Sequence, residues 1–539
     1  MIRFVSIGIL FLLIPAYLYA DGLVTNGVHS AQYSRMLSRN ASTEIDAVYY
    51  NPAGLINLDY GWHYGFGNTF FAGKRNIYSD FPLLISPDYQ GDNQNFIAPN
   101  GYVAYRTDKW ILSAGFGQVI AEGNTHYRNG IPSYEIGISK LKLNNQFEID
   151  DYKASIEFAS RLIYWGFQAG ATFEMNDAFS VFGGLRVVTG SDRYSGHVRN
   201  IEVKYAGKFY SGSMWMNTRL GELNDKINNV KPVIESLGTE MSEMGTSGLS
   251  LDVLIQGGIY SQEKADGLID GLRANGIASA NTGWTVQRVW NEYRGVITRA
   301  DAVKREIQSN SSLLNNKTID ANRSATGLTP VLGVCLIPSE DVVLSLKYEY
   351  RTRLNLNVSS HSDDTGLFSE DENSRIDIPP LLAIGVVYKP FYWLWLSSSY
   401  NTYFDKEAGW GWNLREKMQK RLVNRNIDTN TYELALGIQF NMSSRFALSV
   451  GGLMTNPGVA DTYQSDFSYS NPSITAALGF QWKITEYLAL DAGFMNVFYK
   501  DAEVSFKDPD LTVNNGMYSE VLGKTTMGFG FGLSYSIFK

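Results

Sequence analysis

The chain has 539 residues and a net charge of −8, from 46 basic and 54 acidic residues. No run of lysine or arginine stands out, which argues against the electrostatic footprint of a nucleic-acid-binding protein. The 51 glycines and the 33 tyrosines favour β-structure, where aromatic side chains fit a pleated surface, over a series of soluble helical domains.

The first twenty residues have the layout of a secretory signal peptide. Arg3 precedes an apolar run from Phe4 to about Ala16, and Ala20 ends the stretch. The run is too short to span a membrane as a helix. We therefore expect residues 1–20 to be a signal peptide and the mature protein to be exported.

Residues 21–59 precede the first strand-like segment and are predicted to form a separate small element. Their sequence YYNPAGL (residues 49–55) has the features of a stiff turn. Pro52 pushes Asn51 toward an extended backbone, and the Asn51 side chain is expected to cap a short helix that begins at Pro52.

From Tyr60 onward, segments of about ten residues with alternating polarity are separated by turns. Short breaks, such as 107–109 and 175–177, alternate with long polar stretches, such as 201–326 and 455–472. This spacing is typical of an outer-membrane barrel, in which every strand must be paired because lipid satisfies no backbone group. We predict about fourteen strands. They start near residues 60, 100, 110, 158, 179, 327, 341, 381, 393, 431, 445, 474, 487 and 526.

The segment from Val342 onward separates apolar from charged residues. Its charged face carries Lys347, Glu349, Arg351 and Arg353. Because a cation that faces lipid near the midplane costs about 2–4 kcal/mol, we expect this face, joined by Arg186, to line the lumen. Either these cations bind an anionic head group or they form an internal salt-bridge ladder with Glu349.

Residues from about 215 to 310 break the strand rhythm, because their apolar residues recur at helical spacing. We predict a helical insertion on the long-loop side. It would either shield the barrel mouth or contact the substrate.

A signal peptide, about thirty residues, NPAGL and then a barrel of this strand count together resemble the FadL family of outer-membrane channels. That family takes up long-chain fatty acids and, in its toluene-channel branch, aromatic hydrocarbons. Similar strand–turn–strand segments are TPVLGVCLIPSEDVVLSLKYEYR, IPPLLAIGVVYKPFYWLWLSSSY and ELALGIQFNMSSRFALSVGGLMTNP. The resemblance implies an all-β transmembrane barrel of about 14 antiparallel strands over residues 60–539. An N-terminal plug (21–59) would lie inside it, and a helical extracellular insertion would occupy about 201–326.

The resemblance also implies where the substrate passes. Asn51, Pro52 and Ala53 would form a plug turn near the ligand path, and the substrate would leave sideways beside a kinked third strand. In that strand, WILSAGFGQVI (110–120), we expect the kink at Gly115 and Gly117, because glycine weakens strand pairing. The ladder should then be interrupted within residues 112–119. The alternative is that these glycines leave room for the plug.

Catalytic chemistry finds little support in the sequence. The five histidines are scattered without metal-ligand spacing, and no Gly-X-Ser-X-Gly elbow occurs. We therefore expect neither catalytic residues nor a metal or cofactor.

The predicted function is passive uptake of hydrophobic molecules, with long-chain fatty acids as the preferred substrate class. The protein is expected to be a monomer embedded in the outer-membrane lipid of a Gram-negative bacterium. The alternative is a surface-exposed adhesion or structural barrel that binds a protein partner through the helical insertion.

Overall fold

The computed structural model describes residues 30–364, 374–408 and 427–538. The predicted signal peptide (1–20) and the first part of the predicted plug (21–29) lie outside the described residues. Two compact units are present. One comprises the barrel with the N-terminal residues, and the other comprises residues 136–155 and 199–316.

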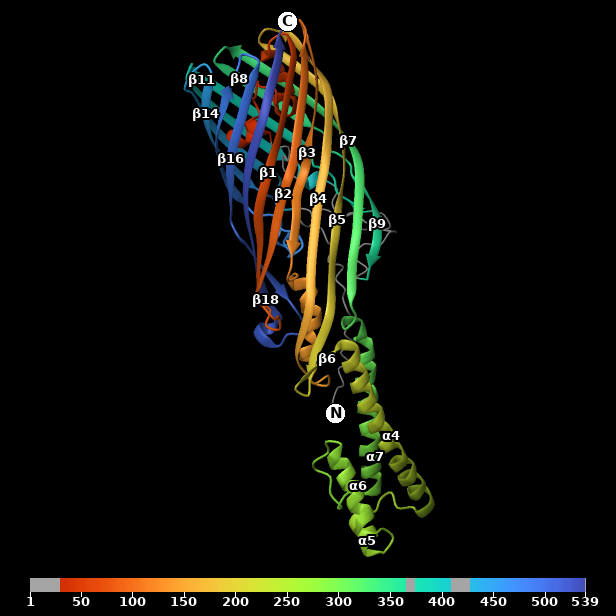
Figure 1. Ribbon diagram of the computed structural model, residues 1–539. Coiled ribbons are helices and arrows are strands. Elements are labelled where there is room, and N and C mark those ends of the chain that lie inside the picture. The colour runs from red at the N-terminus through yellow and green to blue at the C-terminus, as the bar shows by residue number, and fades with distance from the viewer. Residues whose placement is uncertain (1–29, 365–373, 409–426, 539) are drawn as a thin grey trace. The chain divides into compact units, whose positions relative to one another are not determined.

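The strands form a closed antiparallel barrel of 14 strands, which confirms the predicted fold class and count (Figure 1). The barrel closes because β1 (Gly61–Ser79) pairs with β18 (Met517–Phe538) on one side and with β2 (Asp88–Arg106) on the other. The remaining wall strands are β3 (Trp110–Tyr127), β4 (Ile149–Asn176), β5 (Phe179–Tyr205), β7 (Lys317–Ser339), β8 (Val342–Glu349), β9 (Asn355–Asp363), β10 (Ser374–Arg375), β11 (Leu381–Phe391), β12 (Leu394–Tyr403), β13 (Thr431–Asn441), β14 (Phe446–Asn456), β15 (Ser473–Lys483), β16 (Leu488–Tyr499) and β17 (Ala502–Lys507). Three wall strands are interrupted and appear as the pairs β8/β9, β10/β11 and β16/β17, while β6 (Lys208–Ser211) only continues the hairpin of β5.

Several strands begin earlier than their alternation predicts. β2 starts at Asp88 instead of about residue 100, β7 at Lys317 instead of 327, and β18 at Met517 instead of 526. A membrane strand needs only about 9–11 residues, so the additional residues need not alternate between apolar and polar. The polar stretch DYQGDNQN at the start of β2 shows why the pattern does not reveal them.

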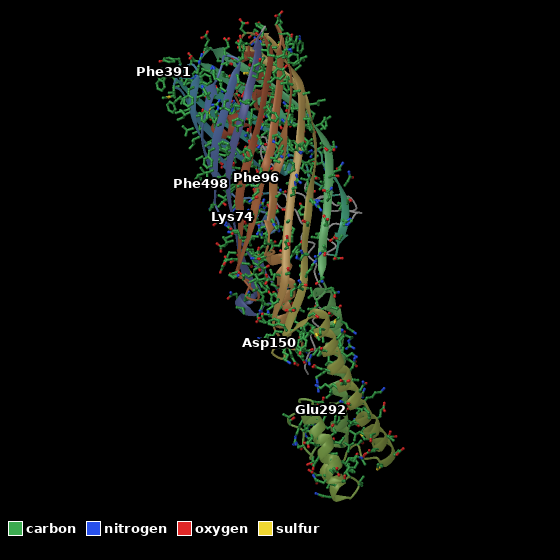
Figure 2. The ribbon with its side chains drawn as sticks, viewed as in Figure 1. Lys74, Phe96, Asp150, Glu292, Phe391 and Phe498 are labelled. Atoms are coloured by element: carbon green, nitrogen blue, oxygen red, sulfur yellow. The ribbon has the colours of Figure 1, made fainter. Side chains whose placement is uncertain are left out.

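The outer face of the barrel is apolar. In β18, alternate residues expose between 41% and 53% of their surface, namely Met527, Phe529, Phe531, Leu533, Tyr535 and Ile537. Phe391, Phe498 and Phe96 are also more than half exposed and are labelled in Figure 2. An apolar belt of this extent would aggregate in water, so it identifies the barrel as a transmembrane one.

Among the helices of the described residues, none combines the length and apolar character needed to cross a membrane.

The N-terminal segment, here residues 30–59, fills the interior of the barrel. It contains α1 (Ala31–Arg35), α2 (Ala47–Tyr50) and the 3₁₀ helix η1 (Pro52–Asn57), and nearly all of its residues up to Ile56 are buried. Inward glycines let its backbone approach the wall. A Cβ added at Gly493 would lie 2.3 Å from the Arg35 nitrogen, and one at Gly385 would lie 2.4 Å from the Ala41 nitrogen.

The second unit contains the predicted helical insertion. Its main helices are α4 (Gly212–Met244), α5 (Leu251–Gln256), α6 (Gln262–Ala274) and α7 (Val286–Ser309). Each is capped by a serine or threonine whose oxygen accepts a backbone N–H three residues on. The helices bury a core of their own that includes Leu237, Leu254 and Val289. Shorter helices elsewhere are α3 (Pro132–Ser139), η2 (Lys140–Leu143), η3 (Ser311–Leu313), η4 (Asp405–Glu407), η5 (Asp461–Tyr463) and η6 (Val513–Gly516).

Candidate functional site

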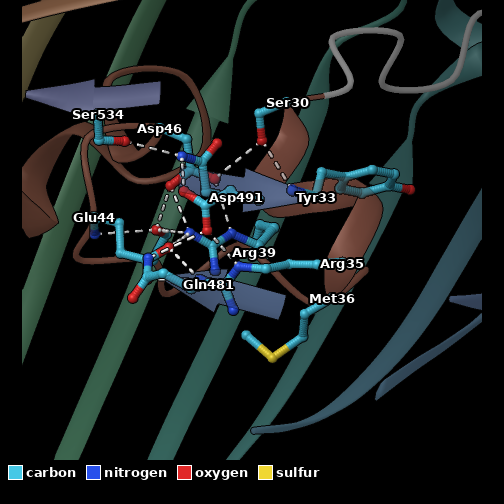
Figure 3. Close-up of polar contacts among 12 residues, drawn as sticks. Ser30, Tyr33, Arg35, Met36, Arg39, Glu44, Asp46, Gln481, Asp491 and Ser534 are labelled. Atoms are coloured by element: carbon cyan, nitrogen blue, oxygen red, sulfur yellow. Dashed lines mark hydrogen bonds and ion pairs between the residues drawn. The ribbon is translucent and has the colours of Figure 1, made fainter. Parts of the chain in front are cut away.

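Arg35 fastens the N-terminal segment to one side of the barrel wall (Figure 3). Its side chain is fully buried, and its Nε donates to Asp491 Oδ1 of β16 at 2.8 Å. Its Nη1 donates to Gln439 Oε1 of β13 at 2.6 Å and to Ser449 Oγ of β14 at 2.7 Å. Its Nη2 donates to Glu44 at 2.7 Å. One guanidinium group therefore ties three wall strands to the segment.

Arg39 holds the turn that follows α1. Its guanidinium contacts Asp46 through Nε and Nη2 at 2.8 and 2.6 Å, and its Nη2 donates to Glu44 Oε2 at 2.6 Å (Figure 3). Burial opposes ionisation of Glu44, but Arg35 and Arg39 together lower its pKa to about 2. The carboxylate is therefore charged at neutral pH, and residues 35–46 form one charged network.

The predicted plug turn lies on another side of the interior. Asn51 is 1% exposed, and η1 begins at Pro52, as predicted. The Asn51 side chain does not cap that helix, so this detail of the prediction is wrong. Its Nδ2 instead donates to the Ser42 carbonyl at 3.0 Å and lies 3.9 Å from the sulfur of Cys335.

Wall side chains hold the turn in place through its backbone. Thr172 of β4 donates its hydroxyl to the Pro52 carbonyl, and Ser180 of β5 donates to the Ala53 carbonyl, each at 2.7 Å. Ala53 itself is completely buried. The three residues of the predicted turn therefore lie together, between the wall and the rest of the N-terminal segment.

Two of the four predicted lumen cations lie together against Tyr49. Arg186 and Lys347 are 4% and 2% exposed, and both bond Glu349, at 2.7 Å for the nearest atoms of each pair. Lys347 Nζ also donates to the Tyr49 carbonyl at 2.9 Å, and the Tyr49 ring lies 4.4 Å from the Arg186 guanidinium carbon. These two residues therefore form the internal ion pairs that were one of the alternatives. Two cations share one carboxylate, which leaves a net positive charge.

Arg353 does not line the lumen, so its predicted orientation is wrong. The wall strand is interrupted between Glu349 and Asn355, and the inward–outward alternation shifts there by one residue. Thr352 and Leu354 become fully buried, while Arg353 between them is exposed. A one-residue slip moves each following side chain to the other face.

Arg351 belongs to the same interruption and not to the cluster around Glu349. Its Nε lies 3.7 Å from Asp377 Oδ2. The predicted set is thus divided. Arg186 and Lys347 line the lumen, whereas Arg351 and Arg353 lie at the break in the strand.

The backbone ladder between β2 and β3 is interrupted. Pairing runs from Arg106–Ile111 to Gly101–Phe116, stops, and resumes at Gln94–Asn124. The predicted interruption within residues 112–119 is therefore confirmed, and Gly117 is the first residue of β3 without a β2 partner. Pro99 lies in the unpaired part of β2 and has no N–H to donate.

Gly115 has a different role from the one expected. It remains paired with Tyr102 of β2 and with Gln168 of β4, so the break does not lie there. A Cβ at Gly115 would lie 3.0 Å from Val48 of the N-terminal segment. This glycine leaves room for the segment, which was the alternative interpretation.

Side-chain hydrogen bonds of Asn95 and Gln118 cross the interruption in the β2–β3 ladder. Asn95 Nδ2 donates to Gln118 Oε1 at 2.8 Å, and Gln118 Nε2 donates to the Ile97 carbonyl at 2.9 Å. On the other side of β3, its pairing with β4 shifts register near Val119 and again near residue 122. No continuous backbone ladder therefore joins β2 to β3 between Gly101–Phe116 and Gln94–Asn124.

An apolar hollow of about 720 Å³ lies where the paired part of this ladder ends. Gly101 and Phe116, the last pair, are among its lining residues. The lining also includes the exposed rings of Phe66 and Phe167, which are 62% and 51% exposed. The hollow thus opens on the lipid-facing side of the wall.

The charged network of the N-terminal segment was not predicted from the sequence. The sequence does show the residues that form it: two arginines and two carboxylates within residues 35–46, and a single carboxylate, Asp491, among the small residues on one face of β16. Neither stretch indicates which cation meets which carboxylate.

The sequence matches no family model and no curated protein. Among solved structures, a FadL homologue of Pseudomonas aeruginosa matches with a TM-score of 0.54 at 12% identity, covering 96% of this chain and 99% of that one. The toluene transporter TodX of P. putida matches with a TM-score of 0.48 at 10% identity, covering 92% and 95%. The toluene transporter TbuX of Ralstonia pickettii matches with a TM-score of 0.45 at 11% identity, covering 96% and 99%. The chain therefore has the fold of the P. aeruginosa FadL homologue, and the resemblance stated from the sequence is confirmed at the level of the fold.

Proposed function

We propose that this chain is an outer-membrane channel for passive uptake of hydrophobic molecules, with long-chain fatty acids as the substrate class. One observation carries the proposal: the wall ladder fails between β2 and β3, beside the N-terminal segment, and an apolar hollow lies at the end of the paired part. In this proposal residues 1–20 are a signal peptide, residues 21–59 are the plug, and the exported chain works as a monomer in the outer membrane of a Gram-negative bacterium.

Lateral exit suits an apolar cargo. Exposing apolar surface to water costs about 25 cal/mol per Å², so delivery into lipid is favoured over delivery into the periplasm. The gap between β2 and β3 offers the path, since the backbone ladder is interrupted there and Asn95 and Gln118 bridge it through their side chains. Entry to the gap requires the plug to shift, because Val48 packs within contact distance of Gly115.

The two cations around Glu349 support a fatty acid over a neutral hydrocarbon. Arg186 and Lys347 share the single carboxylate of Glu349 and are both buried. A buried excess of positive charge is stabilised by an anion that accepts hydrogen bonds. A carboxylate head group provides one, and toluene does not.

Uptake measurements in a strain that lacks its own fatty-acid channel test the proposal. Expression of this chain should restore uptake of labelled oleate. Uptake of labelled toluene without uptake of oleate would replace fatty acids by aromatic hydrocarbons as the substrate class. Uptake of neither compound by a folded and inserted barrel would overturn the channel function.

The alternative, an adhesion or structural barrel, is favoured by the separate core of the helical unit.

Removal of the helical insertion distinguishes the two functions. A Cβ added at Gly212 would lie 2.8 Å from Leu314 Cβ, so a short Gly–Ser linker can replace residues 213–313. Because β5 and β7 pair independently of the helices over residues 179–198, the shortened barrel should fold and keep oleate uptake within about two-fold. The heat-induced shift in gel mobility reports folding. Loss of uptake in a folded barrel would assign the insertion to the passage.

A further inference from the structure

The long-loop end of the barrel interior contains a second buried core, separate from the one around the N-terminal segment. Its side chains come from β1–β5, β7, β17 and β18, and from Phe467 and Tyr469 of a loop. None of the described residues 30–59 belongs to it. Within β2, Tyr89 at one end belongs to this core, whereas Tyr102 near the other end packs with the N-terminal segment. The lumen therefore holds two blocks of packed side chains in series.

A loop between β14 and β15 contributes the inward part of this second core. We call its residues 460–471 the outer lid. Asp466, Phe467, Ser468 and Tyr469 each expose at most 7% of their surface, which is unusual for a loop because its backbone polar groups must then find partners inside the protein. The Phe467 ring packs edge-on against Tyr134 and Phe158, with centroids 5.5 Å apart in each pair. The outer lid is thus folded into the lumen.

Hydrogen bonds within the outer lid give it a shape of its own. The Gln464 side chain donates to the Ser470 carbonyl at 2.8 Å and accepts the Ser470 N–H at 2.9 Å. The backbones of Ser465 and Ser468 exchange two further bonds, at 2.9 and 3.1 Å. A compact loop closed by its own bonds is typical of an Ω-loop, which can move as one body.

Side chains dock the outer lid onto the wall. Asp466 accepts the Ser133 N–H at 2.7 Å and the Ser133 hydroxyl at 2.6 Å. The Tyr469 hydroxyl donates to the Gly523 carbonyl at 2.9 Å, and Asn471 donates to the Leu522 carbonyl at 2.8 Å. Each of these bonds has a side chain on at least one partner, unlike the rungs of the barrel ladder. Undocking the lid through them leaves the pairing of the wall strands intact.

The two ends of the loop are fixed while its middle is docked. At one end, the Gly458 carbonyl accepts the N–H groups of Asp428 and Thr429 at 2.8 and 3.1 Å. At the other end, the Pro472 carbonyl accepts the Lys500 N–H at 2.9 Å. A loop anchored at both ends and docked in between by side chains has the construction of a lid.

We propose that the outer lid is a gate that must undock before an apolar molecule from the long-loop side reaches the N-terminal segment. This inference rests on the proposed function, because it assumes that the substrate crosses the lumen from that side. Asp466 and Ser133 are its latch. The channel then has two gates in series, and the lid keeps the lumen closed when the N-terminal segment shifts.

A cross-link across the latch tests whether the lid must move. In a C335S background, S133C/D466C is joined by a short cleavable thiol reagent, and oleate uptake is measured. The matched control is D80C/S519C. Asp80 accepts the Ser519 N–H and hydroxyl at 2.6 and 3.0 Å, which is the same pattern of bonds, but it joins two neighbouring wall strands. Uptake should fall at least ten-fold in S133C/D466C, recover on reduction and stay unchanged in the control. Wild-type uptake by cross-linked S133C/D466C would overturn the gate.

A second measurement does not depend on transport. Ala321 of β7 is completely buried in the second core, so A321C in the C335S background reports access past the lid. Labelling by a water-soluble methanethiosulfonate should be slow, at least ten-fold faster with S133A/D466A added, and unchanged with D80A/S519A added. Equal labelling of all three proteins, with folding confirmed by the heat-induced shift in gel mobility, would overturn the lid. If the wild type takes up neither oleate nor toluene, the proposed function fails, and this labelling alone decides whether the lid opens.

Discussion

Replacing Arg35 with methionine is expected to loosen the α1 end of the N-terminal segment from β13, β14 and β16 and to make the barrel leaky. The substitution leaves Asp491 without its buried cation, takes one of its two cations from Glu44, and removes the bonds to Gln439 and Ser449. Breaking one partner of a buried ion pair costs about 3–5 kcal/mol. The wall ladder does not use Arg35, so the barrel itself should remain folded. Ion conductance in planar bilayers should rise at least ten-fold over the wild type.

Two variants control this experiment. R273M breaks an exposed pair with Asp270 in α6, where each side chain is at least half exposed, and should leave conductance unchanged. R35M/D491L removes both charges of the pair and should be less leaky than R35M alone, since no carboxylate is left unpaired on β16. Wild-type conductance in a folded R35M barrel would show that this network does not hold the segment.

Cross-linking β2 to β3 across the gap is expected to abolish uptake. Asn95 and Gln118 contact each other at 2.8 Å from opposite sides of the interruption. In a C335S background, N95C/Q118C joined by a short bifunctional thiol reagent fixes the two strands together. Oleate uptake should fall at least ten-fold, because the substrate cannot pass between them into lipid. A cleavable reagent should restore uptake on reduction.

The control cross-link joins two strands in a continuous part of the wall. Leu436 of β13 is directly opposite Gly452 of β14, and a Cβ at Gly452 meets no atom within 4 Å. L436C/G452C, treated with the same reagent, should keep its uptake. A cross-linked N95C/Q118C protein that transports oleate at the wild-type rate would rule out this gap as the exit.

The sequence predicts the barrel well because lipid imposes a period of two on every wall strand. That constraint ends outside the membrane, which is why β2 and β7 begin about ten residues before their predicted starts. It also fails at a break in the strand, which is why the face predicted for Arg353 is wrong. The interruption beside Gly117 was predictable because glycine signals weak pairing.

The contacts that hold the N-terminal segment could not be predicted in the same way. Arg35 and Asp491 are 456 residues apart in the chain and meet only because the barrel closes around the segment. Lys347 and Glu349 share a face by alternation, but the sharing of Glu349 with Arg186 depends on the order of strands in the wall. Local sequence patterns identify which face of a strand a residue occupies, whereas closure of the barrel determines which residue it bonds to.

The accessibility of Cys335 tests most directly whether the plug moves during uptake. This residue is the only cysteine of the chain, is fully buried, and lies 3.9 Å from the Asn51 side chain. Its modification by a small water-soluble methanethiosulfonate can be followed by mass spectrometry, with R35M as the control for a displaced plug. We predict slow labelling of the wild type alone and at least ten-fold faster labelling while oleate is taken up. A thiol that stays protected in a sample that is transporting oleate would contradict the account.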